Sequence, residues 1–299
     1  MAHWGICSTV KAPTEQVLAF VAHHLDLGAR RIWLYFDDPA DPAADALTGI
    51  ERVTVTRCDA AHWRSVCSRR PDKHQNRQTR NMQRTYAKCR LPWLAHIDVD
   101  EFLLPTGPIR DLLDTLPPET ILLPMAPWEA LHDPNLPDDI FTARHFRAGM
   151  RGGVHSENRR QVFGPLAPLL PLGVLSHAVG KCFFRTGIAD LEPRLHGAFQ
   201  HGERLPNGPF SPEIALLHFH AEDPARWKDR LQFRLTLGAY QFNPNLQAHL
   251  MAADEAGIDA FFTAVQQPNA ATLKLLHDID VLIETDLALR AKVTALLAR

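Results

Sequence analysis

The sequence predicts an α/β fold, and three observations support that prediction. The chain has 299 residues, of which 45% are hydrophobic, and this suits one large α/β domain with room for a helical extension. Short apolar runs alternate with helical patterns over the first hundred residues, as in βαβ units. An apolar run at residues 93–95 leads into three acidic residues, and open α/β sheets bind ligands at the carboxyl ends of their strands.

The first βαβ unit is predicted within the first forty residues. Residues 4–10 have strand character, and Pro13-Thr14 then allow a helix to begin. Apolar residues follow at helical spacing up to Gly28, and residues 31–36 form a second strand that ends in Asp37-Asp38. The unit lacks the Gly-x-Gly-x-x-Gly pattern, which argues against a dinucleotide cofactor.

The chain then continues in the same alternation. We expect a helix near residues 43–47, a strand at 53–57 and a helix at 69–90 whose basic residues share one face. A solvated charged face explains most of these basic residues. The functional alternative is that one or two of them bind the diphosphate of a ligand. Further strands are predicted at 121–125, 181–185 and 214–220, and an irregular stretch at 141–176. From residue 223 onward we expect helices apart from a break at Asn243-Pro244, with an apolar stripe at helical spacing over residues 278–299.

The stretch from Ala95 to Leu103 is the most informative part of the sequence. We expect a buried strand in which Asp98 and Asp100 share one face and Glu101 starts the exit loop. Two neighbouring carboxylates repel each other unless positive charge lies between them. A hard divalent cation that also holds phosphate oxygens is the simplest such charge.

Composition excludes several classes of function. The net charge is -2, which argues against a nucleic-acid binder that works through bulk electrostatics. The five cysteines are widely spaced without a Cys-x-x-Cys pair, so we expect reduced thiols in a cytoplasmic protein. No signal sequence or membrane-spanning run is apparent, and contact with a membrane surface stays open.

These residues together resemble the GT-A glycosyltransferases, in particular a bacterial family-2-like branch with an Asp-Val-Asp-Glu-Phe core. The most specific match is Trp93 to Leu103. The other matching positions lie in six short stretches: Val10-Lys11, the His23 to Ala29 segment, Leu34 to Asp38, Arg77-Gln78 with Asn81, Lys181 with Phe184-Arg185 and His196, and Leu217 to Phe219. This chain has Ala12-Pro13 after the lysine, where the family usually has Asn-Glu.

The resemblance implies a fold, a reaction and a site. The fold would be a Rossmann-like, mixed and mainly parallel sheet flanked by helices, with residues 1–222 as the catalytic domain and 223–299 as a helical region packed on it. The reaction would move a sugar from a nucleotide donor, a UDP-sugar before a GDP-sugar, to a saccharide or lipid-linked hydroxyl, with inversion. The implied donor-binding residues are Lys11, Asp38, Arg77, Gln78, Asp98 and Lys181. The implied ligands of Mn²⁺ or Mg²⁺ are Asp98, Asp100 and His218.

An inverting transfer also needs a general base for the acceptor hydroxyl. Glu129, Asp133 and Glu157 are the candidates, because we expect each to lie in a loop after the Asp98/Asp100 strand. His218-Phe219-His220 would place two imidazoles on one strand face. A histidine ligand would favour Mn²⁺ over Mg²⁺, although ordinary hydrogen-bonded histidines explain these residues equally well.

Two other functions compete with this interpretation. A metal-dependent phosphohydrolase also uses an Asp-x-Asp strand, but its motif normally lies on the first strand of the domain, and Phe102 stands where that class has threonine or valine. A non-catalytic nucleotide-binding or carbohydrate-binding protein would explain Ala12-Pro13 and the unresolved base.

Overall fold

The computed structural model describes residues 2–136 and 143–298. The chain divides into two compact units, each built from segments that are distant in sequence. The first unit contains residues 1–126, 179–216 and 288–299, and the second contains 127–178 and 217–287. The predicted regions 1–222 and 223–299 are continuous in sequence, whereas these units interleave because strand pairing joins distant segments. That division into domains stays a prediction.

The first unit is built on a mixed, mainly parallel sheet. Strands β1 (Trp4–Val10), β2 (Arg31–Phe36), β3 (Val53–Arg57) and β4 (Trp93–His96) are parallel, with β1 between β4 and β2. Strand β8 (Lys181–Arg185) joins β4 antiparallel, and the first residues of β6 (Leu122–Ala130) pair with β8. The predicted α/β fold class is therefore confirmed, and the early strands lie where the apolar runs placed them.

Close packing explains one glycine in this sheet. Gly5 lies in β1 beside β2, where an added Cβ would come within 2.7 Å of the Trp33 ring and 2.8 Å of the Arg31 carbonyl oxygen. Real Cβ contacts are not this short, so only glycine allows the two parallel strands to pair here with Trp33 folded over them.

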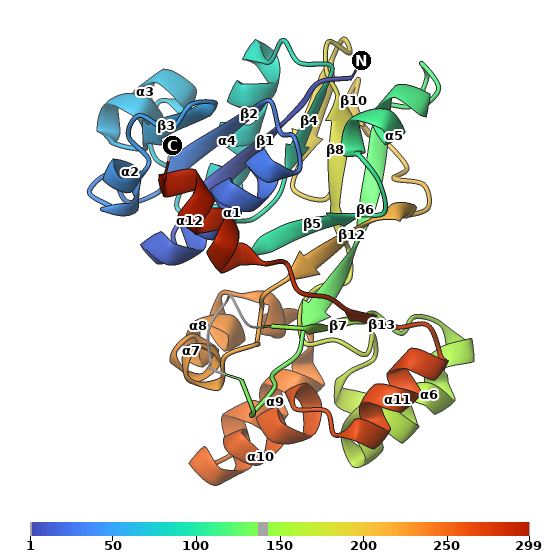
Figure 1. Ribbon diagram of the computed structural model, residues 1–299. Helices are drawn as coiled ribbons and strands as arrows, with labels where there is room; N and C mark the ends of the chain where they lie inside the picture. The colour runs from blue at the N-terminus through green and yellow to red at the C-terminus, as the bar shows by residue number, and fades with distance from the viewer. Residues whose placement is uncertain (1, 137–142, 299) are drawn as a thin grey trace. The chain divides into compact units, whose positions relative to one another are not determined.

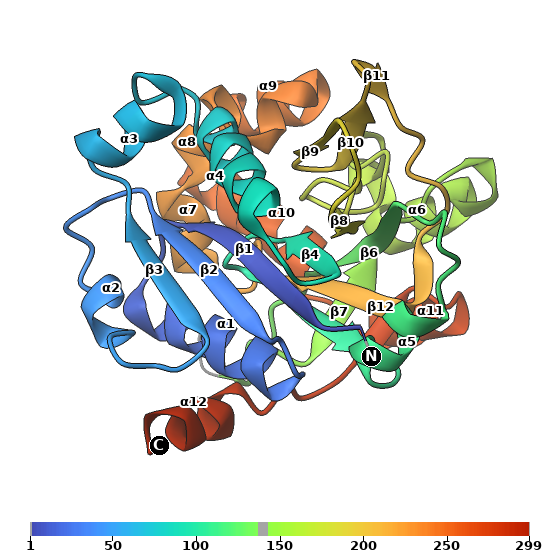
Figure 2. The same ribbon diagram turned by 90° about the horizontal axis from the view of Figure 1, so that it is seen from above.

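Helices cover both faces of the sheet (Figures 1 and 2). Helices α1 (Thr14–Asp26) and α12 (Leu289–Leu297) lie on one face, and α3 (Ala60–Cys67) and α4 (His74–Lys88) lie on the other. Helix α4 begins five residues later than predicted, because Pro71 and Asp72 lie in a turn whose carbonyls accept hydrogen bonds from Arg77. Short helices α2 (Ala43–Ala46) and α5 (Ile109–Thr115) complete the helical part of this unit.

Buried hydrogen bonds join α4 to the sheet. The Asn81 side chain, which is completely buried, donates to the Thr9 hydroxyl at 3.0 Å and pairs with the His62 ring at 2.9 Å. Tyr35 and Thr85 share a second bond of 2.9 Å between β2 and α4. Asn81 is thus a structural residue that fixes α4 against β1 and α3.

Smaller strands complete the first unit. Strand β5 (Glu101–Pro105) pairs with β12 (Ser211–His218), and β9 (Leu191–Arg194), β10 (Gly197–Gln200) and β11 (Glu203–Arg204) form a separate antiparallel sheet. Packing of β9 against α4 places this small sheet beside the helix.

The second unit combines a short antiparallel ladder with helices around one core. The end of β6 pairs with β7 (His145–Ala148), which pairs with β13 (Leu282–Glu284). The helices are α6 (Ser156–Phe163), α7 (Pro224–Asp229), α8 (Leu231–Thr236), α9 (Pro244–Ala252), α10 (Glu255–Gln266) and α11 (Ala270–Asp278), with 3-10 turns η1 (Gly153–His155), η2 (Gly164–Leu169) and η3 (Ala239–Phe242). Trp227, Tyr240, Phe261 and Phe262 are among its buried core residues.

Two local predictions are wrong in this part of the chain. The stretch 141–176 was expected to be irregular, but it contains β7 and α6, and the segment after residue 278 contains β13 before α12. Strands β7 and β13 pair with each other across more than a hundred residues, and β7 also pairs with β6. A pattern within one segment does not reveal such pairing. Among the described residues, no helix combines the length and the apolar character needed to cross a bilayer.

Candidate functional site

Asp98 and Asp100 lie on a tight turn between two strands. Strand β4 ends at His96 and β5 begins at Glu101. The Glu101 backbone N–H donates to the Asp98 carbonyl at 3.0 Å, and the Asp98 backbone N–H donates to the Glu101 carboxylate at 2.7 Å. The prediction of one continuous strand is therefore wrong, as is the exit loop at Glu101. These two bonds close the turn and start the next strand.

The turn brings together three of the predicted donor-binding residues. The Asp98 carboxylate accepts a hydrogen bond from the Gln78 amide on α4 at 2.5 Å and another from the Lys181 ammonium at 2.7 Å. Lys181 begins β8 and is 1% exposed, whereas the Asp98 side chain is 26% exposed. The sheet and α4 thus fix the orientation of a carboxylate that still reaches solvent.

The charges of Lys181, Asp98 and Glu101 influence one another at this turn. The Lys181 ammonium lies 3.8 Å from the Glu101 carboxylate, and Glu101 is completely buried. Burial raises the pKa of Glu101, opposed by the Lys181 charge. Burial alone would lower the pKa of Lys181, but the Asp98 and Glu101 carboxylates raise it above its ordinary value. Lys181 is therefore a permanently charged ammonium held against Asp98.

The donor set at the turn suits a hard cation. Three carboxylates occur within four residues here, and oxygen ligands are those that Mg²⁺ and Mn²⁺ prefer. Lys181 and Gln78 each use one Asp98 oxygen, and each carboxylate oxygen has a second lone pair. One Glu101 oxygen is buried and accepts no hydrogen bond from the described residues. Asp98 and Asp100 therefore fit such an ion in kind.

A cavity of about 790 Å³ opens at the carboxyl ends of three parallel strands. Lys11 follows β1, Asp37 and Asp38 follow β2, and Cys58 and Asp59 follow β3. The other wall is the segment that contains α3 and the residues after it, and the whole lining is Lys11, Asp37, Asp38, Pro39, Cys58, Asp59, Ala60, Trp63, Arg64, Ser68, Arg69 and Arg70. This is the position at which open α/β sheets bind ligands.

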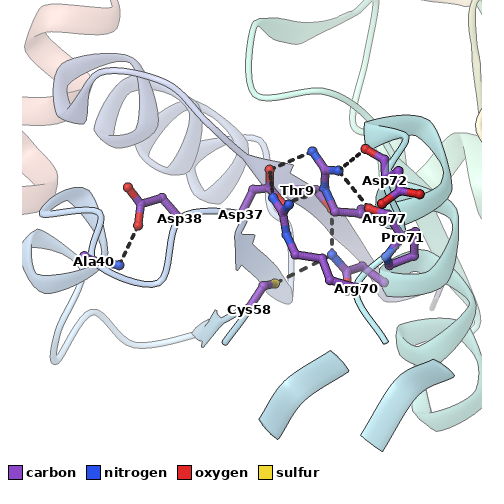
Figure 3. A network of polar contacts seen from close by, with 10 residues as sticks. Thr9, Asp37, Asp38, Ala40, Cys58, Arg70, Pro71, Asp72 and Arg77 are labelled. Atoms are coloured by element: carbon purple, nitrogen blue, oxygen red, sulfur yellow. Dashed lines mark hydrogen bonds and ion pairs between the residues drawn. The ribbon is translucent and has the colours of Figure 1, made fainter. Parts of the chain in front are cut away.

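Asp37 holds two arginines at the edge of this cavity (Figure 3). Its carboxylate pairs with Arg77 at 2.7 Å and 3.0 Å and with Arg70 at 3.0 Å. Arg77 also donates to the carbonyls of Pro71 and Asp72, at 2.9 Å and 2.7 Å. With its donors used in this way and 9% exposure, Arg77 braces the loop before α4, and this geometry does not favour the predicted contact with the donor.

His74, the first residue of α4, is electrostatically close to both the cavity and the turn. Burial lowers the pKa of His74, the Arg77 charge lowers it further, and Asp98 and Asp37 oppose both effects. Lys11 acts on it as well. One ring thus senses charges from the ends of β1, β2 and β4, so these strand ends form one electrostatic neighbourhood.

The three candidate bases all belong to the second unit, and two are not in loops. Glu129 lies in β6 and is completely buried, where it pairs with Arg147 at 3.0 Å and accepts from the backbone N–H groups of Leu175 and Ser176. Glu157 lies in α6 and pairs with the exposed Arg160. The loop placement of both residues is wrong, because β6 continues through Pro127 and α6 follows the glycines.

Asp133 and His218 also lie in the second unit. Asp133 is in a turn, where its carboxylate accepts from Asn135 at 2.9 Å. His218 ends β12, with its ring centroid 5.5 Å from that of His177 and 5.3 Å from that of His220. His220 lies beyond the strand end, so the expectation of two imidazoles on one strand face is wrong. The catalytic and metal-binding roles of these residues stay predictions.

The arginines of the cavity wall were not among the predicted site residues. Arg64, Arg69 and Arg70 lie close together in sequence, outside any motif, and Arg64 is in α3. Their clustering in the sequence could have indicated an anion-binding surface. Four arginines fall between residues 64 and 77, with no acidic residue between Arg64 and Arg70. Glu101 was likewise expected in a loop, whereas it closes the turn.

Comparison with known proteins identifies no family for this chain. No protein-family model matches the sequence, and no curated protein matches it. One similar solved structure is a CMP:2-keto-3-deoxy-manno-octonic acid synthetase complexed with CTP, at 15% identity and a TM-score of 0.28. The similarity covers 42% of this chain and 53% of that chain.

Two further solved structures are similar at the same low level. HddC from Yersinia pseudotuberculosis shares 10% identity over 78% of this chain and 99% of that one, with a TM-score of 0.33. The mannosyltransferase Ktr4p from S. cerevisiae shares 11% identity over 44% of this chain and 40% of that one, with a TM-score of 0.26. At these identities and TM-scores the similarities carry no information about the substrate of this chain.

Proposed function

We propose that this protein is a GT-A-type glycosyltransferase that moves a sugar from a nucleotide donor to a hydroxyl acceptor. The observation that carries the proposal is the cavity at the carboxyl ends of β1, β2 and β3 together with the acidic turn after β4. A nucleotide needs a concave site of this size, and its diphosphate needs cationic groups. Lys11 supplies a cation to the cavity, and Lys181 supplies one at the turn.

The residues of the turn would prepare the site for the leaving group. Lys181 and Gln78 fix both oxygens of Asp98, so this carboxylate needs little reorientation when a donor binds. A divalent ion held by Asp98 and Asp100 would supply positive charge for the departing diphosphate. Lys11, Asp38 and Gln78 remain the proposed donor contacts, with a UDP-sugar favoured over a GDP-sugar and inversion as the expected stereochemistry.

Asp133 and Glu157 are the proposed candidates for the general base. Glu129 is less suitable, because its two oxygens already accept hydrogen bonds from Arg147, Leu175, Ser176 and Gln266. A base must have a free lone pair within hydrogen-bond distance of the acceptor hydroxyl. The acceptor itself is proposed only as a saccharide or a lipid-linked saccharide.

A screen of UDP-sugars and GDP-sugars with Mn²⁺ tests this function. We expect slow release of nucleoside diphosphate from one donor, and we expect Asp98→Asn and Asp100→Asn each to lower its rate about 100-fold. Asp111→Asn changes an exposed carboxylate on α5 and should leave the rate unchanged. Equal rates in all four proteins, or no donor consumed and no nucleoside diphosphate bound, would refute the proposal.

One observation favours a second candidate, a nucleotide-binding protein without catalytic activity. Both Asp98 oxygens already have partners and Glu129 is buried, as expected where carboxylates have a structural role. In that case the screen would find metal-independent binding of a nucleoside diphosphate and no turnover of any sugar donor.

A further inference from the structure

The cavity at the ends of β1, β2 and β3 has more positive than negative charge. Its lining contains four cations, Lys11, Arg64, Arg69 and Arg70, and three carboxylates, Asp37, Asp38 and Asp59. Arg77 adds a fifth cation through its contact with Asp37. The balance is therefore two positive charges, in a protein whose overall net charge is -2.

The three carboxylates of the cavity are already committed to bonds within the protein. Asp37 pairs with Arg70 and Arg77, as Figure 3 shows. Asp38 accepts a hydrogen bond from the Ala40 backbone N–H at 2.9 Å, and Asp59 caps α3 by accepting from the His62 backbone N–H at 2.7 Å. None of these acids pairs with Lys11, Arg64 or Arg69.

Those three cations have no ion-pair partner among residues 2–136 and 143–298. Arg64, Arg69 and Lys11 are exposed side chains that line the same cavity, and like charges held close together repel unless an anion lies between them. Grouping three unneutralised cations in one concavity therefore favours an anionic ligand, because a cleft lined mainly by one sign of charge concentrates ions of the opposite sign.

Arg70 is held so that it takes part in this wall. Its guanidinium makes a single contact with Asp37 at 3.0 Å, and its side chain is 48% exposed. Arg77 fixes the other oxygen of Asp37 and the carbonyls of Pro71 and Asp72, next to Arg70 in sequence. This brace orients Arg70 and leaves most of its donors available.

A buried indole completes the cavity. Trp63 lines it, is 1% exposed, and its ring nitrogen has no hydrogen-bond partner among the described residues. Because that nitrogen is itself buried, Trp63 contributes the apolar surface of its ring to the lining, and the groups available to an anion are the cations.

We propose that this cavity is a phosphate-binding site whose positive wall is formed by Arg64, Arg69 and Arg70, with Lys11 facing it from the end of β1. A phosphate group carries about 1.5 to 2 negative charges at neutral pH, which matches the balance of two positive charges. The further step, that this phosphate is the diphosphate of the nucleotide donor, rests on the function proposed above. Anion binding itself does not depend on that function.

Titration of the full-length protein with inorganic pyrophosphate, followed by calorimetry, tests this site. We expect Arg64→Gln combined with Arg69→Gln to weaken binding about tenfold, because glutamine keeps polarity and removes both charges. Arg90→Gln removes an exposed arginine outside the cavity and should leave binding unchanged. Binding should also weaken as salt rises from 50 to 300 mM, by a smaller factor in the double variant, where two of the four lining cations are gone.

A substitution of opposite sign guards against a general loss of structure. Asp59→Asn keeps the helix cap, because asparagine caps helices as well as aspartate, and it removes one negative charge from the cavity. We expect it to strengthen pyrophosphate binding about threefold. A loss of affinity in the double arginine variant together with a gain in Asp59→Asn cannot come from unfolding.

The outcomes separate this inference from the proposed function. Equal pyrophosphate affinity in the wild type and the double variant, or no pyrophosphate binding in the wild type, would overturn the inference while leaving turnover of a sugar donor unaffected. Binding that depends on these arginines in a protein that turns over no donor would support the anion site and count against the transferase. A nucleoside without phosphate should bind the wild type and the double variant equally.

Discussion

Lys181 is almost completely buried, yet it carries a charge beside Asp98 and Glu101. Removal of the ammonium in Lys181→Met would leave a buried acid without its counter-charge. We expect the free energy of unfolding to fall by about 3 kcal/mol, at the low end for a broken buried pair because Asp98 is partly exposed. Urea denaturation measures this loss.

Lys88→Met is the matched control, since Lys88 is exposed in the last turn of α4. Its unfolding free energy should change by less than about 0.5 kcal/mol. A loss below about 1 kcal/mol in Lys181→Met would mean that the Asp98 carboxylate is well solvated without the ammonium, and the description of Lys181 and Asp98 as a stabilising ion pair would then be wrong.

Arg147 and Glu129 form a second buried ion pair, with side chains 1% and 0% exposed. Arg147→Met leaves Glu129 charged and buried, so we expect a loss of about 3–5 kcal/mol. Arg144→Met removes a half-exposed pair with Asp286 and should cost less than about 1 kcal/mol. Unfolding curves of the two variants in urea compare them directly.

This pair also bears on the chemistry. If Glu129 acted as the general base, Glu129→Gln would abolish turnover while leaving stability unchanged. Glu129 instead accepts hydrogen bonds from Leu175, Ser176 and Arg147. We therefore expect Glu129→Gln to lower the free energy of unfolding, and to lower turnover only as a consequence of that lost stability.

At the scale of elements, Arg77 joins the start of α4 to the end of β2. Its bonds reach Asp37 and the carbonyls of Pro71 and Asp72. Arg77→Met would leave these acceptors with fewer donors, and we expect a loss of about 2–4 kcal/mol. Arg80→Met, one turn further along the exposed side of α4, should be neutral within about 0.5 kcal/mol.

A readout specific to this brace is the protection of the loop before α4. Hydrogen exchange of residues 68–73 should speed up in Arg77→Met and stay unchanged in Arg80→Met. If the loop exchanges at the same rate in both variants, Arg77 does not hold it in place.

Sequence patterns correctly placed the strands that can be recognised from their own residues. Strands β1, β2, β3 and β8 lie where they were expected; β1, β2 and β8 are mostly buried, whereas all residues of β3 are partly buried. Strand β6 continues past the predicted end at Met125 and through Pro127 to Ala130. Pairing with β8 and β7 outweighs the local preference there.

The same distinction applies to the candidate site. Asp98, Gln78 and Lys181 were named from the sequence, and Gln78 and Lys181 each donate a hydrogen bond to the Asp98 carboxylate, at 2.5 Å and 2.7 Å. The turn that presents Asp98 depends on two hydrogen bonds between Asp98 and Glu101, and no periodicity in the sequence signals them. The arginine wall was missed because its residues matter through a shared cavity, and a cavity is a property of the folded chain.

At the scale of the whole molecule, buried histidines predict how stability depends on pH. Burial lowers the pKa of His23 to about 4, of His196 to about 4 and of His96 to about 3, and it lowers that of His24 and His220 well below the ordinary value. The unfolded chain binds protons at these residues near pH 6.5, whereas the folded protein binds them only at lower pH, near pH 4 for His23 and His196. Stability is therefore full above pH 6.5 and is lost as the pH falls toward 4.

Each such histidine contributes a slope of up to about 1.4 kcal/mol per pH unit in that window. Glu101 acts in the opposite direction, because its raised pKa makes the folded protein bind a proton that the unfolded chain has lost. Five histidines outweigh one glutamate, so the urea midpoint should fall steadily from pH 7.5 to pH 5.

His23→Gln should make this fall shallower by one histidine's share, because His23 bonds the Leu103 carbonyl at 2.7 Å inside the first unit and glutamine does not titrate. His201, which is exposed, provides the comparison, and His201→Gln should leave the slope as it is. A midpoint that stays constant between pH 7.5 and 5 would show that these rings are protonated or solvated in the folded state, contrary to their burial.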